Sequence, residues 1–145
     1  MNVNFSELNH IEGVTDSFLY NKWGELLAPQ LPYTAARILQ FGKEVALCSV
    51  FLEKMGQGVD FIEFKYEDRR VIIRLSQNFF ILVICEGATD TTLIKLTLNV
   101  IHEEVKGDKD IQKSLNKLSD KKNFLADAHE EPELRELLAT MKITV

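Results

Sequence analysis

The chain has 145 residues, a net charge of −5 and a pI near 5.2. Nucleic acids and anionic membrane surfaces also carry negative charge, so neither is expected as the main partner of this chain. The hydrophobic fraction of 46% and the charged fraction of 27% are typical of a globular protein, and the length suits one domain with an appendage.

The sequence predicts a reduced, cytoplasmic protein. Its first ten residues, MNVNFSELNH, lack the basic region and the long apolar run of a signal peptide. The longest apolar run, residues 79–85, is far too short to span a bilayer. Cys48 and Cys85 lie among apolar residues, where a cysteine usually acts as a small buried hydrophobe.

The N-terminal region predicts a short helix followed by a hairpin. Phe5, Leu8 and Ile11 have helical spacing, and Gly13 follows as a stop. Two short strands are predicted next, at residues 14–21 and 25–28. They are joined at NKWG, and Pro29 ends the second. In that turn Asn21 suits the first position of a type I turn, and Gly24 supplies a residue that tolerates positive φ.

One long helix is predicted over residues 33–55. Pro32 stands near its start, and Gly56 and Gly58 punctuate its end. These two glycines do not form a phosphate-binding loop, because GQGVD lacks both the lysine and the spacing of that motif.

The long helix has a broad apolar face and a second, mixed face. The apolar face contains Ala35, Ile38, Leu39, Phe41, Val45, Ala46, Cys48, Val50 and Leu52. The other side carries Tyr33, Leu47 and Phe51 beside Arg37, Gln40, Lys43 and Glu44. Scattered apolar surface residues are normal. We nevertheless favour a protein–protein surface here, because three large apolar residues follow one ridge with a charged border.

Three strands then follow in quick succession, VDFIEFKY, RRVIIRLS and FFILVICE. The turns between them, at 67–68 and 77–78, are so short that the strands must be antiparallel neighbours. The third strand is apolar on both faces, which predicts helices above and below the sheet. We expect it at the centre, with the hairpin of residues 14–28 beside it.

The first of these three strands is expected at the far edge of the sheet. It places Ile62, Phe64 and Tyr66 on one face, with charged residues interspersed. Polar interruption of this kind is common at a sheet edge, where charge discourages indiscriminate pairing.

A second helix is predicted over residues 91–107, with Asp90 as N-cap and Gly107 as its stop. The composition then becomes charged, and two weaker amphipathic stretches follow, formed by Ile111, Leu115 and Leu118, and by Leu134, Leu137, Leu138 and Met141. Pro132 fits the first turn of the last helix. We therefore predict a domain at 1–107 and a helical appendage at 108–145, either packed on the domain or free to reach a partner.

This order of elements, together with GVTDSFLYNKWGELLA at residues 13–28, resembles the roadblock family of dynein light chains and GTPase regulators. The resemblance covers about residues 4–107 and rests on Gly13 and Val14 leading into the first strand, on Gly24, and on the strand ending near Cys85. It implies a three-layer α+β, profilin-like fold of α-β-α type. The sheet would have five mostly antiparallel strands, with the long helix on one face and the first and last helices on the other.

Members of that family are mostly dimers, joined through their long helices and sheet edges, and they bind small Ras-like GTPases or act as scaffolds. The resemblance therefore implies a non-catalytic homodimeric adaptor or regulator that binds a small Ras-like GTPase, without a cofactor. It would modulate the nucleotide cycle or the localisation of that GTPase. The expected interface comprises Tyr33, Arg37, Gln40, Lys43, Glu44, Leu47, Phe51, Ile62 and Phe64.

No catalytic or metal motif is found in the sequence. His10, His102 and His129 are far apart and belong to no metal-binding motif, and IHEEV is interpreted as a solvated helix end. Apolar neighbours should raise the pKa of the Cys48 thiol and make it inert. Two alternatives to the regulator stay open. One is a pure scaffold that assembles with other roadblock-like chains, and the other is a small-ligand sensor, which would need a cavity with convergent polar groups.

Overall fold

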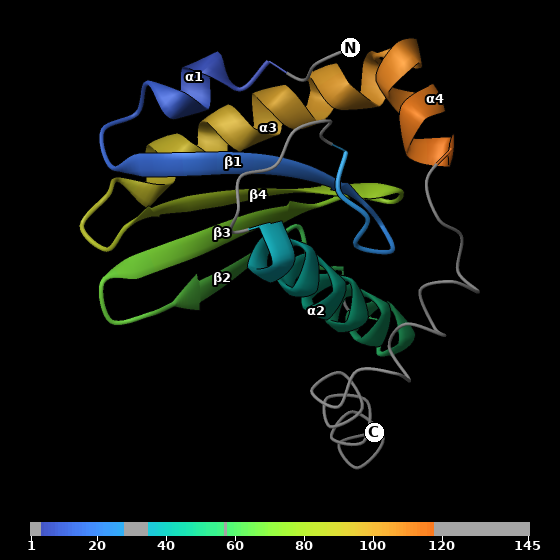
Figure 1. The fold of residues 1–145 in the computed structure, drawn as a ribbon, viewed down its shortest axis with the longest axis horizontal. Coiled ribbons are helices and arrows are strands. Elements are labelled where there is room, and N and C mark those ends of the chain that lie inside the picture. The colour runs from blue at the N-terminus through green and yellow to red at the C-terminus, as the bar shows by residue number, and fades with distance from the viewer. Residues whose placement is uncertain (1–3, 28–34, 57, 118–145) are drawn as a thin grey trace.

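The computed structural model describes residues 4–27, 35–56 and 58–117, and for 35–39 it describes the backbone alone. These residues form three layers (Figure 1). The helices α1 (Ser6–Asn9), α3 (Thr91–Gly107) and α4 (Lys109–Lys117) cover one face of a sheet, and α2 (Ala35–Lys54) covers the other. The predicted distribution of helices over the two faces is confirmed.

The sheet has four antiparallel strands in the order β1-β4-β3-β2. Their bounds are β1 (Val14–Asn21), β2 (Phe61–Lys65), β3 (Arg69–Leu75) and β4 (Phe79–Glu86). The positions predicted for the three C-terminal strands are confirmed, because β4 lies between β1 and β3 while β2 forms the far edge.

The prediction of a fifth strand at 25–28 is wrong for the described residues, where only a single bridge joins Tyr20 to Leu26. The turn itself forms as expected, since the Gly24 N–H donates to the Asn21 carbonyl at 3.0 Å. However, the Glu25 N–H donates to the side-chain Oδ1 of Asn21 at 2.9 Å. The Asn21 side chain thus binds the Glu25 N–H, which a continuous strand pair would use for a backbone hydrogen bond. Asparagine side chains commonly compete with sheet pairing in this way.

Side chains of β4 divide strictly between two apolar clusters. Phe79, Ile81, Val83 and Cys85 pack with α3, whereas Phe80, Leu82 and Ile84 pack in the cluster that contains the α2 residues. Because successive side chains of a strand point to opposite faces, a strand covered on both sides must be apolar throughout. This accounts for the continuous apolar sequence of β4.

The contact between α2 and the N-terminal hairpin is unusually close. Gly24 has φ of +83°, and a Cβ built on it would lie 2.6 Å from the carbonyl oxygen of Gly42. A Cβ built on Gly42 would lie 2.3 Å from the Tyr20 ring. Tyr20 in turn stacks on Phe80 with ring centroids 4.8 Å apart. Two glycines therefore allow the hairpin and the helix backbone to touch.

The two C-terminal helices begin at aspartate caps. The side chain of Asp90 accepts from the Thr92 and Leu93 N–H groups, as predicted, and that of Asp108 accepts from the N–H groups that begin α4. Ile111 and Leu115 are buried in the cluster beneath α3, so the first amphipathic stretch packs on the domain. Leu118 and the second stretch lie outside the described residues, and the boundary after residue 107 stays a prediction.

The close approach at Gly42 gives a direct test of helix placement. We expect Gly42→Ala to destabilise the protein by about 1–3 kcal/mol, because the added methyl group must displace the Tyr20 ring in a packed core. The matched control is Gly107→Ala, where an added Cβ has no neighbour within 4 Å. That change should be neutral or stabilise by up to about 1 kcal/mol. Urea unfolding measures both, and equal midpoints would contradict the packing described.

Candidate interaction surface

The outer edge of β2 carries backbone groups directed away from the rest of the sheet. The Tyr66 N–H donates to the Arg69 carbonyl at 2.9 Å, and the Leu75 N–H donates to the Asp60 carbonyl at 2.8 Å. Because alternate residues of an antiparallel strand bond to the neighbour, Ile62 and Phe64 bond to β3. The backbone N–H and C=O groups of the alternate residues, Phe61, Glu63 and Lys65, then point outward, away from β3.

The two faces of β2 are held by different layers. On the α2 face, Ile62 and Phe64 are half-buried, and the Phe64 ring meets Phe41 of α2 edge-on at 5.6 Å between centroids. On the α3 face, the Phe61 ring lies 5.3 Å from the Arg74 guanidinium and 5.8 Å from the Lys95 ammonium. The edge strand is therefore anchored from above and below while its outer side stays open among the described residues.

Six of the predicted interface residues lie on α2 or β2 with half-buried side chains: Gln40, Lys43, Glu44, Phe51, Ile62 and Phe64. The structure brings α2 and β2 together, as the interface requires, through the Phe41–Phe64 contact. Tyr33 lies outside the described residues, as does the side chain of Arg37. Their roles at an interface stay predictions.

The placement of Leu47 on an exposed ridge is wrong. Leu47 is only 2% exposed and belongs to the apolar cluster on the α2 side of the sheet. Val45, Ala46 and Leu47 are all buried, and three consecutive helical positions span about 200° of the circumference. Burial of α2 is therefore wider than the single face that its periodicity predicts, and a charge at Leu47 would disrupt the core.

Tyr66 is a surface residue that the predicted interface omits. It follows β2 directly and is 54% exposed, in line with the half-buried Ile62 and Phe64. Partial burial, followed by the nearby Glu44 carboxylate, raises the pKa of Tyr66. The alternation of β2 already indicated this residue, since it shares the face of the other two. Tyr66 extends the apolar row at the sheet edge toward α2.

The two cysteines show no sign of activation. Burial, followed by the Glu44 carboxylate, raises the pKa of the Cys48 thiol, which confirms the predicted direction. Burial also raises the pKa of Cys85. Because the thiolate is the reactive form, both shifts make these residues poorer nucleophiles. Among the described residues, no group of three or more histidine, cysteine, aspartate or glutamate side chains could hold a metal ion.

The interpretation of His102 as part of a solvated helix end is wrong. It is 6% exposed, because it follows Leu98 by four positions and precedes Val105 by three, on the side of α3 that faces the sheet. Its Nε2 lies 2.9 Å from Ser76 Oγ. Its Nδ1 lies 3.4 Å from Glu103 Oε1 without hydrogen-bond geometry. The Glu103 side chain is largely exposed, so this trio lacks the buried orienting carboxylate of a catalytic triad.

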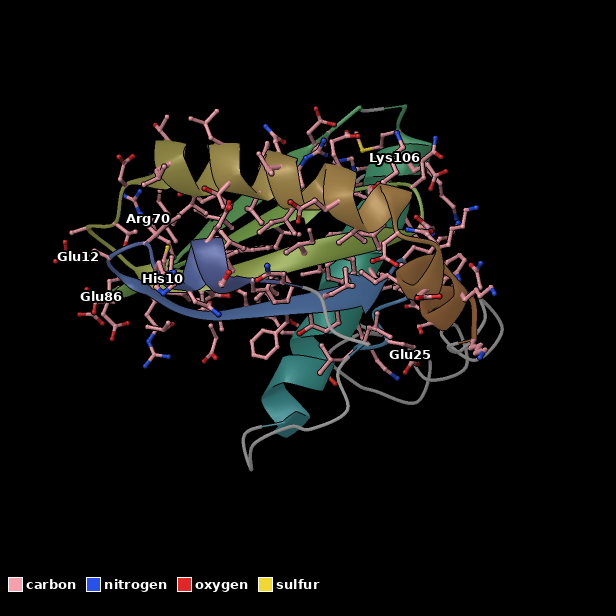
Figure 2. All side chains as sticks on the ribbon, turned by 90° about the horizontal axis from the view of Figure 1, so that it is seen from above. His10, Glu12, Glu25, Arg70, Glu86 and Lys106 are labelled. Atoms are coloured by element: carbon pink, nitrogen blue, oxygen red, sulfur yellow. The ribbon has the colours of Figure 1, made fainter. Side chains whose placement is uncertain are left out.

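A hollow of about 890 Å³ lies beside His102, where the turn between β3 and β4 meets the ends of α2 and α3. Lys106 marks this end of the molecule, whereas Arg70 and Glu86 mark the opposite end (Figure 2). Both positively and negatively charged side chains line the hollow. The Arg74 guanidinium already has partners within the protein, because its Nε donates to Asn99 Oδ1 at 2.9 Å and its Nη1 lies 3.5 Å from Asp60 Oδ1. Arg74, the cation nearest His102 in this lining, is therefore already engaged within the protein.

Comparison with known proteins identifies the fold. No protein-family model matches the sequence, and no curated protein matches it. A roadblock/LC7 domain from Streptomyces avermitilis is similar over 68% of this chain and 87% of its own, with a TM-score of 0.57 and 9% identity. Myxococcus xanthus MglB is similar over 61% of this chain and 77% of its own, with a TM-score of 0.52 and 14% identity. The chain has the roadblock fold, which confirms the resemblance at the level of fold.

No helix within the described ranges is long and apolar enough to cross a membrane. This agrees with the short apolar runs of the sequence.

The burial of His102 predicts an acid-sensitive domain. Burial, followed by the charge of Arg74, lowers the pKa of His102 below its usual value. Below about pH 6.5 the unfolded chain therefore binds a proton that the folded chain resists, and stability falls as the pH drops toward the folded pKa. The loss from this one group is at most about 1.4 kcal/mol per pH unit.

We expect His102→Gln, which keeps a polar partner for Ser76, to lose less stability than the native chain between pH 7 and pH 5. Urea unfolding at several pH values measures this difference. Carboxylates protonate in both proteins, so the difference between the two pH profiles reports the effect of His102 alone. Parallel pH profiles for the two proteins would show that His102 does not resist protonation in the fold.

Proposed function

We propose that this chain is a non-catalytic homodimeric adaptor or regulator that binds a small Ras-like GTPase and modulates its nucleotide cycle or localisation. The observation that carries the proposal is the open edge of β2 beside α2, on a roadblock fold. Edge strands with unpaired backbone groups are templates for pairing with another chain. The family resemblance supplies the class of partner, and the cytoplasm is the compartment that we propose.

The side chains of β2 favour one register for pairing with a second copy. A two-fold axis through Phe64 pairs the outward backbone groups of Glu63 with those of Lys65 of the partner subunit. The two opposite charges then face each other twice on the α3 side of the sheet. An axis through Glu63 would instead place two like charges opposite each other, which is destabilising.

The same register also pairs the apolar residues of the other face. Phe64 meets Phe64 of the partner subunit, and Ile62 lies opposite Tyr66 of the partner subunit. Aromatic pairs and aromatic–β-branched pairs both stabilise antiparallel neighbours. This pairing supports a role for the exposed Tyr66 ring, and it continues the Phe41–Phe64 contact toward the two-fold axis.

A charge swap tests this register. Glu63→Lys alone and Lys65→Glu alone each place like charges opposite each other, and we expect the dissociation constant to rise about tenfold or more. The double variant with both changes restores two opposite pairs and should dimerise nearly as tightly as the native chain. Sedimentation equilibrium measures the constants.

Rescue is the decisive outcome, because the single variants also change local contacts such as the 3.6 Å approach of Glu63 to Arg70. A native chain that remains a monomer of 16.6 kDa at micromolar concentration would contradict the dimer. A dimer that none of the three variants affects would contradict pairing through β2.

The regulator and the scaffold differ in what they do to a GTPase. We expect the purified chain to bind a purified small Ras-like GTPase from the same source with at least a fivefold preference between its GDP-loaded and GTP-loaded forms. It should also change that GTPase's rate of hydrolysis or exchange. Isothermal titration and single-turnover assays measure these quantities, with the chain alone as the control for intrinsic turnover.

Dimerisation without binding to any small Ras-like GTPase, in either nucleotide form, would favour the scaffold of roadblock-like chains. Nucleotide hydrolysis by the chain alone would overturn the non-catalytic proposal.

A further inference from the structure

The outward face of α3 carries a row of exposed apolar side chains. Leu93, Leu96 and Val100 are 47%, 60% and 51% exposed, although this helix already buries a complete apolar face against the sheet. Their spacing of three and then four residues places them on one side of the helix, which we call the α3 stripe. An amphipathic helix needs one apolar face, so a second one indicates a surface that another element covers.

The C-terminal part of the chain contains a matching row. Leu134, Leu137 and Met141 repeat the spacing of the α3 stripe, and Leu138 widens the row. These residues lie outside the described part of the structure. Two helices whose apolar residues repeat at spacings of three and four pack along a common seam, as in coiled coils.

Charge selects a parallel arrangement of the two rows. Glu103 and Glu104 are exposed at the C-terminal end of the α3 stripe, three and four positions beyond Val100. In a parallel arrangement Lys142 approaches these two carboxylates, while Glu130, Glu131 and Glu133 lie near the N-terminus of α3, where the helix dipole favours negative charge. An antiparallel arrangement would place acidic residues against Glu103 and Glu104.

The chain can reach this position without leaving its own domain. α4 packs against α3 and buries Ile111 and Leu115, so the described chain ends at Lys117 on the α3 side of the sheet (Figure 1). Sixteen residues, 118–133, separate Lys117 from Leu134. They can span roughly 50 Å when extended. The stretch of α3 from Gly107 back to Leu93 is about 21 Å long, so the reach is ample.

We propose that residues 134–141 form a helix that docks in parallel on the α3 stripe of the same chain. Leu134 then lies beside Leu93, Leu137 beside Leu96, and Met141 beside Val100. The docked segment then covers the α3 stripe, on the side of the sheet opposite α2. This arrangement is independent of the proposed dimer and of its GTPase partner.

Disulfide trapping in the full-length chain tests the register. We expect Leu96→Cys combined with Leu137→Cys to form an intramolecular disulfide under mild oxidation, at a rate that does not depend on protein concentration. The matched control combines Leu96→Cys with Glu136→Cys, because Glu136 lies on the opposite side of the predicted helix. The control should react at least tenfold more slowly.

Hydrogen exchange of residues 134–141 gives a second measurement that needs no new cysteine. We expect protection of at least tenfold in the native chain, its loss in Leu96→Glu, and its retention in Asn116→Glu, which adds the same charge at an exposed position on α4. Equal trapping of both cysteine pairs, or no protection in the native chain, would overturn the proposal. Concentration-dependent, disulfide-linked dimers would overturn it in favour of docking on a second copy.

Discussion

The close packing of Gly42 against Gly24 and against the Tyr20 ring, which itself stacks on Phe80, sets the position of the long helix. No side chain separates the hairpin turn at Gly24 from the backbone of α2 at Gly42, and the Tyr20 ring fills the adjacent space against the sheet. Tyr20 is fully buried, and burial raises its pKa. Because this contact fixes one side of α2, it also determines where the other side meets β2, through Phe41 and Phe64. The candidate surface at the sheet edge thus depends on a contact at the opposite edge.

Much of this arrangement follows from local sequence. The apolar run of β4 predicted a strand covered on both faces. Asp90 caps α3 through its side-chain carboxylate, and Gly24 closes its turn through its backbone N–H. Short turns fixed the antiparallel order of β2, β3 and β4. The alternation of residues 61–66 predicted an edge strand because its charges suit neither a fully covered strand nor a buried helix. These features need only the neighbouring residues in the sequence.

Three features depend on specific side-chain or tertiary contacts, which the periodicity of the sequence did not reveal. Leu47 is buried outside the face that helical periodicity assigns to the core, because periodicity detects one face and not every surface that meets the helix. His102 is buried because Ser76, from another element, provides its polar partner. The strand expected at 25–28 is reduced to a bridge because the Asn21 side chain captures the Glu25 N–H. In each case a specific tertiary or side-chain contact outweighs the local pattern.

The edge strand β2 is held by both helical layers, which makes it a suitable template for pairing with a strand of another chain. Phe64 contacts α2 through Phe41, while Phe61 lies near Lys95 of α3, and Arg74 beside it donates to Asn99 of the same helix. A strand fixed from above and below loses little conformational freedom when another chain pairs with it, so less of the binding free energy is lost to ordering. The contacts through Phe61 and Arg74 also join the edge to α3. The α3 stripe and the β2 edge are therefore distinct surfaces on two adjoining layers, joined through Phe61 and Arg74.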